Sequence, residues 1–425
     1  MENYYAASGG ATPERARVEG RIEAEVCVIG AGFAGLSTAY GLLQRGVEDV
    51  VVVEAECVGH GASGRNGGFV FGGYSLDCAD LLAQQGPQRA RAMYALTRQA
   101  VDLIRRRIAE EGIACDAIEG GALLANWFDD DTILERQQRL MAEGFGVDWR
   151  LVPREEMPSW VRTRRYTAGL LEPDAFHFHP LKYARGLAVA IERRGGRVLE
   201  RSPVLRTEAL PGDRGHVVHV QGGGRVQARR LVVTAGGYLK GGVAPALERA
   251  MLPIATYAMA TEPLGARLDE FIPARPALYD TRFAFDYYRP LPDTRILWGG
   301  RISIRDRRPE DIARFLKADL LKVFPELHDV RVEYAWGGLM SYARHKMPQV
   351  GRLPDGAWHA LGFGGHGVAP TTAAGELLAD AVSGRAPVPP AFADYGLSRV
   401  WGHAGRLAAQ ATYSWAEARD WFNDR

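Results

Sequence analysis

The sequence has few cysteines and no pattern of residues that would bind a metal. Its 425 residues include four cysteines, which lie too far apart for a zinc ribbon or a CxxC redox pair. His177 and His179 flank Phe178, but no third ligand stands at a suitable spacing. We therefore expect no metal site, and free thiols in a reducing compartment at the four cysteines: Cys27, Cys57, Cys78 and Cys115.

The sequence also lacks an excess of charge and a segment suited to crossing a membrane. Lys and Arg total 52 and Asp and Glu total 51, so no positive field exists to hold nucleic acid. Residues 1–20 contain no apolar core of a signal peptide. Residues 26–43 carry no charge, but four glycines interrupt them and only their first third is β-branched. These features predict a cytoplasmic protein with no membrane span and no nucleic-acid partner.

Glycine is abundant, with 50 residues, and its first cluster has a recognisable arrangement. Residues 25–29 read as a buried strand, Gly30-Ala-Gly32-Phe-Ala-Gly35 follows, and a helix-like run comes next. Gly30 allows a tight turn, Gly32 lets a pyrophosphate approach the backbone, and Gly35 lets the helix pack on the strand. A second strand ends in Glu54, whose carboxylate can accept hydrogen bonds from ribose hydroxyls. The segment therefore predicts a dinucleotide site.

A second glycine-rich loop, Gly61-Ala-Ser-Gly-Arg-Asn-Gly-Gly68, follows the second strand. Together the two loops resemble the family of FAD-dependent amine and amino-acid oxidases that includes D-amino acid, glycine and sarcosine oxidases. Further segments extend the resemblance over residues 22–390: residues 176–183, 229–238, 336–351 and 361–368. The loop at 61–68, His-Pro-Leu-Lys-Tyr at 179–183 and Tyr-Tyr-Arg-Pro at 287–290 are most similar to the γ-glutamylputrescine oxidase branch.

The resemblance and the motifs imply FAD as the cofactor and assign its contacts. Sarcosine oxidases link the flavin to a cysteine in the segment that matches residues 336–347, but this sequence has no cysteine after Cys115, so we expect noncovalent FAD. The expected contacts in the two glycine loops and after the second strand are Gly30, Gly32, Phe33, Ala34, Gly35, Glu54, Ala55, Gly61, Ala62, Ser63, Arg65, Asn66, Gly67 and Gly68. Those expected from later segments are Val204, Ala235, Gly236, Gly338, Gly364, Gly365, His366, Gly367 and Val368.

The expected fold class is α/β, with a Rossmann-like FAD-binding domain and an inserted α+β substrate domain that carries an antiparallel sheet. The predicted FAD-binding domain comprises residues 22–80, 165–250 and 330–390, and the predicted substrate domain comprises residues 81–164 and 251–329. Residues 1–21 are expected to be a disordered N-terminal extension, and residues 391–425 a helical tail used for packing or oligomer contact.

The resemblance implies oxidation of the C–N bond of an amine, by hydride transfer to flavin N5, followed by imine hydrolysis. The expected partners are a small-molecule amine, for which a γ-glutamylated polyamine in catabolism is the leading candidate, and oxygen or another electron acceptor. Residues predicted to shape the catalytic step are Arg344, His345, Lys346 and Tyr287. Aromatic residues on the expected sheet are candidates for either the pocket wall or the core: Tyr257, Phe285, Tyr287, Tyr288 and Trp298.

Several alternatives stay open from the sequence. A glycine, sarcosine or D-amino-acid oxidoreductase would need an arginine to hold the substrate carboxylate, with Arg289 and Arg344 as candidates. A flavin-containing RNA-modification or binding module is the alternative of another class, and a flavoprotein without chemistry is a third. Sarcosine oxidases place an oxygen-activating lysine about where residues 296–299 fall, and this sequence has none there, so oxidase and dehydrogenase remain alternatives. The oligomeric state is undecided.

Overall fold

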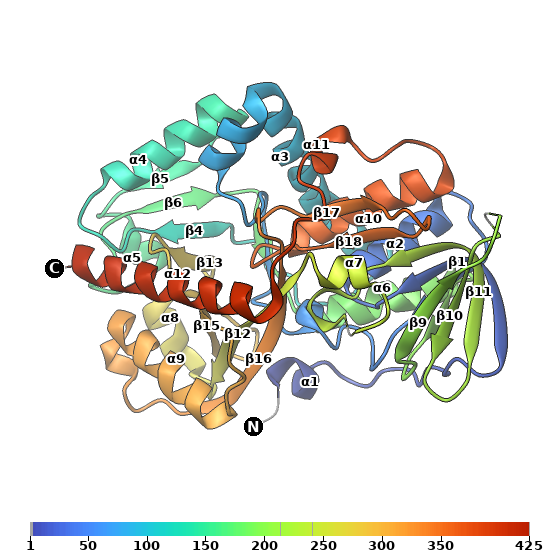
Figure 1. The fold of residues 1–425 in the computed structure, drawn as a ribbon. Helices are drawn as coiled ribbons and strands as arrows, with labels where there is room; N and C mark the ends of the chain where they lie inside the picture. Colours follow the sequence, from blue (N-terminus) through green and yellow to red (C-terminus); the bar gives the residue numbers. More distant parts are fainter. Residues whose placement is uncertain (1–2, 213, 240, 425) are drawn as a thin grey trace.

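A computed structural model describes residues 3–212, 214–239 and 241–424, which form two mixed sheets with helices packed around them (Figure 1). In the first sheet, the central strand β1 (Arg21–Ile29) pairs in parallel with β2 (Val50–Val53) and β11 (Arg225–Val233). The sheet order is β17-β18-β11-β1-β2-β8, with β9 and β10 forming an antiparallel extension of β11. The remaining strands are β8 (Arg197–Leu199), β9 (Val204–Ala209), β10 (His216–Val220), β17 (Gln349–Arg352) and β18 (Trp358–Leu361).

The helices of this half pack closely because small residues line their contacts. Helix α2 (Phe33–Gln44) follows β1 and contacts α10 (Val368–Ser383). A Cβ on Gly375 would lie 2.5 Å from the Cβ of Ser37, so only glycine allows this approach of the two helices. The other helices here are α3 (Cys78–Glu110), α6 (Pro180–Arg193), α7 (Pro245–Glu248) and α11 (Pro390–Ala393).

The second sheet has the order β16-β12-β15-β14-β13-β4-β6-β5, and all its pairs are antiparallel except β4 with β13. Its core includes the rings of Tyr288 and Trp298, which stack at 4.3 Å with Phe324 at their edges. The strands are β4 (Ala122–Ala125), β5 (Arg150–Val152), β6 (Gly169–Glu172), β12 (Leu252–Thr261), β13 (Ala277–Asp280), β14 (Tyr287–Pro290), β15 (Ile296–Ser303) and β16 (Val332–Tyr342). The helices are α4 (Thr132–Arg139), α5 (Met157–Trp160), α8 (Leu268–Phe271), α9 (Pro309–Val323) and α12 (Gly402–Asn423).

Two strands of the predicted FAD-binding ranges lie in the second sheet. β6 and β16 belong to the second sheet, although the ranges 165–250 and 330–390 were expected to build the nucleotide-binding half. Both strands are in the second sheet because their backbones pair with β4 and β12 there. The exact division into domains therefore stays a prediction. A small sheet of β3 (Phe69–Val70) and β7 (Phe176–His177) stands apart from both large sheets.

The expectation of a disordered N-terminal extension is wrong for the described residues. A short helix, α1 (Tyr4–Ser8), buries Tyr4 and Tyr5. The ring of Tyr5 packs edge-on against Trp336 and His179, so apolar burial fixes this segment on the molecule. At the other end, α12 crosses the second sheet, as Figure 1 shows. No helix within the described ranges has the length and apolar character needed to cross a membrane.

Candidate active site

The first glycine loop joins β1 to α2 in the way that its sequence predicts. Gly30 has φ +104°, a conformation that strongly favours glycine, and a Cβ there would meet the carbonyl of Thr234 at 3.2 Å. A Cβ on Gly35 would lie only 1.9 Å from the oxygen of Gly30. The glycines therefore hold the start of α2 directly against the end of β1.

The second glycine loop supports the first. The hydroxyl of Ser63 accepts a hydrogen bond from the backbone N–H of Phe33 at 2.9 Å, so this loop caps the first turn of α2. A Cβ on Gly32 would approach the same hydroxyl to 3.0 Å. The side chain of Asn66 holds the loop by donating to the carbonyls of Ala62 and Ser63. A helix N-terminus bordered by glycine backbone is suited to a phosphate group.

Glu54 lies directly after β2, where the sequence predicts a ribose contact. Its carboxylate accepts hydrogen bonds from the backbone N–H groups of Ala31 at 2.8 Å and Glu56 at 3.0 Å. Burial raises the pKa of Glu54, and these N–H donors oppose the rise. The carboxylate is thus fixed in orientation beside the glycine loop.

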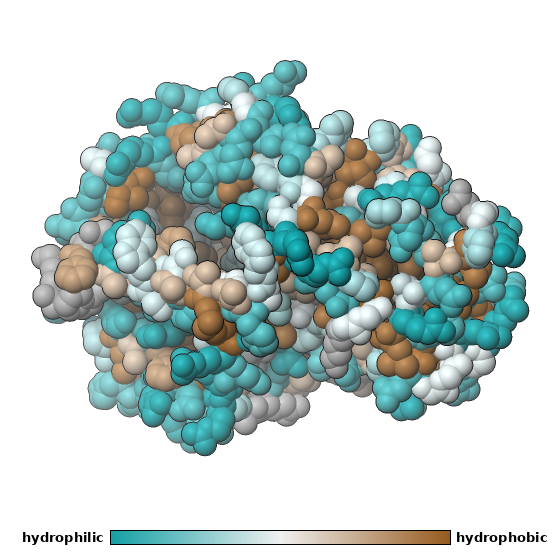
Figure 2. All heavy atoms as spheres, viewed as in Figure 1, coloured by the Kyte–Doolittle hydropathy of each residue, from teal (hydrophilic) through white to brown (hydrophobic). Residues whose placement is uncertain are grey.

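These loops border one cavity of about 840 Å³ that continues between the two sheets. Figure 2 shows brown, apolar side chains in hollows of this face, while most of the surrounding surface is teal. The predicted cofactor residues that line the cavity are Gly30, Gly32, Phe33, Ala34, Glu54, Ala55, Gly61, Ala62, Ser63, Arg65, Asn66, Gly67, Val204, Ala235, Gly236, Gly338, Gly364, Gly365, His366, Gly367 and Val368. Gly35 and Gly68 lie behind the lining, where they permit close packing.

His366 lies in the wall as a neutral side chain. Its ring packs on Phe71 with centroids 4.1 Å apart, and its Nε2 donates to the carbonyl of Phe71 at 3.4 Å. Burial lowers the pKa of His366 to about 4. The imidazole therefore carries no charge near neutral pH.

Tyr287, predicted as a catalytic residue, also lines the cavity. A Cβ on Gly299 would lie 2.1 Å from its ring, and one on Gly67 would lie 2.6 Å from it. Two glycines thus make room for this ring, one in the second sheet and one in the loop after β2. Burial raises the pKa of the phenol, which remains protonated over the physiological range.

Arg344, His345 and Lys346 do not line the cavity in the described structure. The guanidinium of Arg344 packs over Trp401, and the Nε2 of His345 donates to the carbonyl of Gly396 at 3.3 Å. Lys346 is exposed and has φ +60° in the turn after β16. This turn leads the chain away from the cavity, so the geometry gives no support to a catalytic role for the three residues.

The candidate aromatic residues divide between wall and core. Phe285 and Tyr287 line the cavity, whereas Tyr257, Tyr288 and Trp298 lie in the core of the second sheet. The successive residues Tyr287 and Tyr288 face opposite sides of β14, as strand geometry requires.

Several lining residues were not predicted: Phe71, Tyr94, Tyr279, Phe283, Arg301, Tyr342 and Tyr413. The sequence does hold a signal for the unusual position of Arg301. Gly299 and Gly300 precede it, and glycine inside a strand often marks a bulge. The register of β12 and β15 does shift beside Gly300, and Arg301 has φ +54°. Tyr413 had none, because its position in the wall depends on where α12 packs.

The residues fit FAD. A glycine loop at a helix start, a buried carboxylate at the next strand end and a long cavity between two sheets suit a dinucleotide with a large ring system. Gly30 to Ala34 and Ser63 would hold the pyrophosphate and Glu54 the ribose.

Comparisons with known proteins agree. The profile of the FAD dependent oxidoreductase family (DAO) matches residues 25–381. Gamma-glutamylputrescine oxidoreductase of Escherichia coli is 35% identical over 92% of this chain and 91% of its own length. Glycine oxidase from Geobacillus kaustophilus has the same fold, with a TM-score of 0.74 at 18% identity over 90% of this chain and all of that one. L-proline dehydrogenase from P. horikoshii gives 0.73 at 19% identity over 92% and 99%. The chain belongs to the DAO family of FAD-dependent oxidoreductases.

Proposed function

We propose that this chain oxidises the C–N bond of a γ-glutamylated polyamine such as γ-glutamylputrescine. The observation that carries the proposal is the 35% identity to gamma-glutamylputrescine oxidoreductase, because it covers nine-tenths of both chains. The cavity that runs from Glu54 to Tyr413 offers room for a cofactor and an amine in one space. The four cysteines form no disulfide, which supports the cytoplasmic location that belongs to this proposal.

The arginines favour an amine over an amino acid as substrate. Arg289 is fully buried and donates to the carbonyls of Gly67 and Phe178 and to the hydroxyl of Tyr5. It does not line the cavity, and each of its three guanidinium nitrogens already has a partner within the protein. A carboxylate on the reacting carbon would therefore find no partner in Arg289, one of the two arginines expected to hold it.

The arginines within the described lining are Arg65 and Arg301, and both already bind oxygen acceptors. Arg65 donates to the carbonyl of His60 at 2.7 Å, and Arg301 forms a two-point ion pair with Asp319. Glycine, sarcosine and D-amino acids would need an arginine that is free to bind the substrate carboxylate. Because both guanidinium groups are already bonded within the protein, they support a substrate whose reacting carbon bears no carboxylate.

When bound, FAD supplies the two-electron acceptor. The chain's own residues form the cavity in which the amine would lie beside the cofactor. Tyr287 and His366 are both uncharged near neutral pH, so neither repels the other or competes for a proton with the substrate nitrogen. The reacting amine must enter as the free base, and the resulting imine hydrolyses in water to a carbonyl compound and ammonia.

Anaerobic mixing of the holoenzyme with a panel of amines tests this proposal. We expect γ-glutamylputrescine to bleach the flavin absorbance at least tenfold more efficiently than putrescine, glycine, sarcosine or D-alanine, a difference of about 1.4 kcal/mol. Faster bleaching by any of the three amino acids would overturn it. Readmitting oxygen then identifies the acceptor: fast recolouring with peroxide indicates an oxidase, and slow recolouring indicates another acceptor.

A further inference from the structure

The C-terminal helix α12 contributes to the cavity, which the sequence does not indicate. Tyr413 of this helix lines the cavity and is only 5% exposed. The helix crosses the second sheet and contacts β12 and β15 (Figure 1). These two strands belong to the second sheet, whereas the first glycine loop follows β1 of the first sheet.

Polar contacts fix the first half of α12 to the end of β15. The backbone N–H of Ile304 donates to the side chain of Gln410 at 3.2 Å, and Arg406 donates to the carbonyl of Ile304. Glu417 lies 3.9 Å from the guanidinium of Arg301, which itself lines the cavity. The helix is thus held beside the bulge that places Arg301 in the wall.

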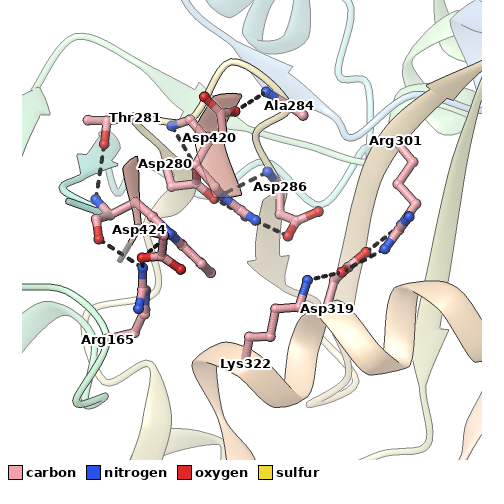
Figure 3. A network of polar contacts seen from close by, with 12 residues as sticks. Arg165, Asp280, Thr281, Ala284, Asp286, Arg301, Asp319, Lys322, Asp420 and Asp424 are labelled. Atoms are coloured by element: carbon pink, nitrogen blue, oxygen red, sulfur yellow. Dashed lines mark hydrogen bonds and ion pairs between the residues drawn. The ribbon is translucent and has the colours of Figure 1, made fainter. Parts of the chain in front are cut away.

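The second half of α12 holds a loop of the wall, as Figure 3 shows. The backbone N–H of Ala284 donates to the carboxylate of Asp420 at 3.1 Å. Directly after the helix, Asp424 accepts a hydrogen bond from the indole N–H of Trp127 at 3.1 Å and pairs with Arg165. The C-terminal end of α12 is therefore anchored to the loop at residues 281–286 and to Trp127 and Arg165.

The same loop is held from its other side by a buried ionic cluster. Arg282 binds the carboxylates of Asp280 and Asp286, and its guanidinium lies 3.6 Å from the ring of Trp127. Because the loop ends are fixed, Phe283 and Phe285 stand in the cavity wall while keeping part of their surface exposed. Their rings and that of Tyr413 make this end of the cavity largely aromatic.

We propose that α12 and the loop at residues 281–286 form the outer wall of the substrate end, and that Tyr413 determines how long an aliphatic amine fits. This inference rests on the proposed function for the identity of the ligand. Aromatic faces suit the methylene chain of a polyamine, which gains affinity through apolar contact. Removing the ring of Tyr413 lengthens the space available to that chain.

The first test measures access and needs no turnover. Acrylamide quenching of the bound flavin's fluorescence is compared in wild type, Tyr413→Ala, Tyr413→Phe and Trp415→Ala. Trp415 lies on the same helix but is 63% exposed, so its variant is the matched control. We expect the quenching constant to rise at least about twofold in Tyr413→Ala and to keep its wild-type value in Tyr413→Phe and Trp415→Ala. An unchanged constant in Tyr413→Ala overturns the proposed wall.

The second test measures specificity with γ-glutamyl diamines of increasing methylene number. In Tyr413→Ala we expect each added methylene beyond the wild-type optimum to gain about fourfold in apparent affinity, whereas Trp415→Ala keeps the wild-type order. An identical order in Tyr413→Ala and wild type overturns the role in specificity. If no amine reduces the wild-type flavin, the proposed function fails, and the quenching test still decides the position of the wall.

Asp420→Ala provides a second variant in case Tyr413→Ala does not retain its flavin. It leaves the ring of Tyr413 in place but removes the acceptor for the N–H of Ala284. We expect the same direction of change in quenching, at smaller size, because the loop loses one anchor. Behaviour like that of Trp415→Ala in this variant overturns the role of α12 in holding the loop.

Discussion

The hydroxyl of Ser63 accepts a hydrogen bond from the backbone N–H of Phe33 across 2.9 Å. This contact joins the second glycine-rich loop to the first residue of α2. It satisfies one of the N–H groups left free at a helix start and sets the distance between the two loops that border the cavity. The two sequence motifs therefore act as one binding unit.

Ser63→Ala should weaken FAD binding without unfolding the protein. Loss of a side chain that caps a helix costs about 1 kcal/mol, so we expect the Kd for FAD to rise about fivefold. Titration of the apoprotein with FAD, followed by flavin fluorescence, measures the change. Ser159→Ala is the control, because that exposed hydroxyl bonds only its local helix turn. Equal affinities in the two variants would contradict the capping role.

Gly35→Ala should prevent formation of the cofactor site. The added Cβ would stand 1.9 Å from the carbonyl oxygen of Gly30, which belongs to the backbone and cannot move aside cheaply. Overpacking of this kind costs about 3 kcal/mol or more. We expect purified Gly35→Ala to be colourless and to melt at a lower temperature. Gly241→Ala, where the nearest atom is 3.8 Å away, should match wild type in both respects.

Glu172 predicts a dependence of stability on pH. Its carboxyl accepts one hydrogen bond from the N–H of Gly72 at 3.2 Å, while its Oε2 has no partner among the described atoms. Burial raises its pKa from 4.5 to about 8. The folded chain thus keeps the proton over a range in which the unfolded chain loses it. Stability from this group is present below pH 4.5 and is lost as pH rises to about 8.

Glu172→Gln isolates that effect because glutamine keeps the shape and does not ionise. We expect the variant to resemble wild type near pH 4.5 and to exceed it by about 4 kcal/mol in the free energy of unfolding near pH 8. Urea denaturation at several pH values checks this. A constant difference between the two proteins across this range would show that Glu172 does not titrate as its burial requires.

The nucleotide half was predictable because its signals are local. The strand, glycine turn, helix and second strand follow one another within residues 21–54, so spacing alone places Gly30 and Glu54. The wall of the cavity is built by distant segments instead. Alternation along β14 requires Tyr287 and Tyr288 to face opposite ways, but only the packed sheet shows which one faces the cavity.

The prediction for residues 344–346 was not supported because residues that follow a cavity-lining strand in sequence need not line the cavity once the chain has turned. Gly338 to Tyr342 line the cavity from β16, yet the chain then turns, and Arg344 and His345 lie against Trp401 and Tyr395 instead. In the same way, nothing in the tail sequence indicates that Tyr413 reaches the cavity. Both outcomes depend on tertiary packing that sequence patterns do not encode.

Noncovalent binding of FAD is a separate prediction. The four cysteines lie at or before residue 115, and Cys78 is the one that lines the cavity. Burial raises the pKa of Cys78 to about 12, so its thiol has little of the thiolate character that a flavin thioether would require. Acid precipitation should release all the yellow colour into the supernatant. Colour retained in the pellet would contradict noncovalent binding.

Arg344→Ala and Lys346→Ala should leave amine-driven reduction of the flavin within about twofold of wild type, because surface substitutions without key contacts change energies by about 0.5 kcal/mol or less. Tyr287→Ala should behave differently. It removes a ring that fills the space between Gly67 and Gly299, so we expect a loss of at least tenfold in the reduction rate, about 1.4 kcal/mol.

Stopped-flow reduction by the best amine measures all three variants, and flavin content per chain checks that each retains its cofactor. Tyr287→Phe separates shape from chemistry. It keeps the ring in place and loses only a hydroxyl group that stays protonated, so its rate should lie near wild type. A loss in Tyr287→Phe as large as in Tyr287→Ala would assign the hydroxyl a direct part in the reaction. A loss in Arg344→Ala would return that residue to the active site despite its position against Trp401.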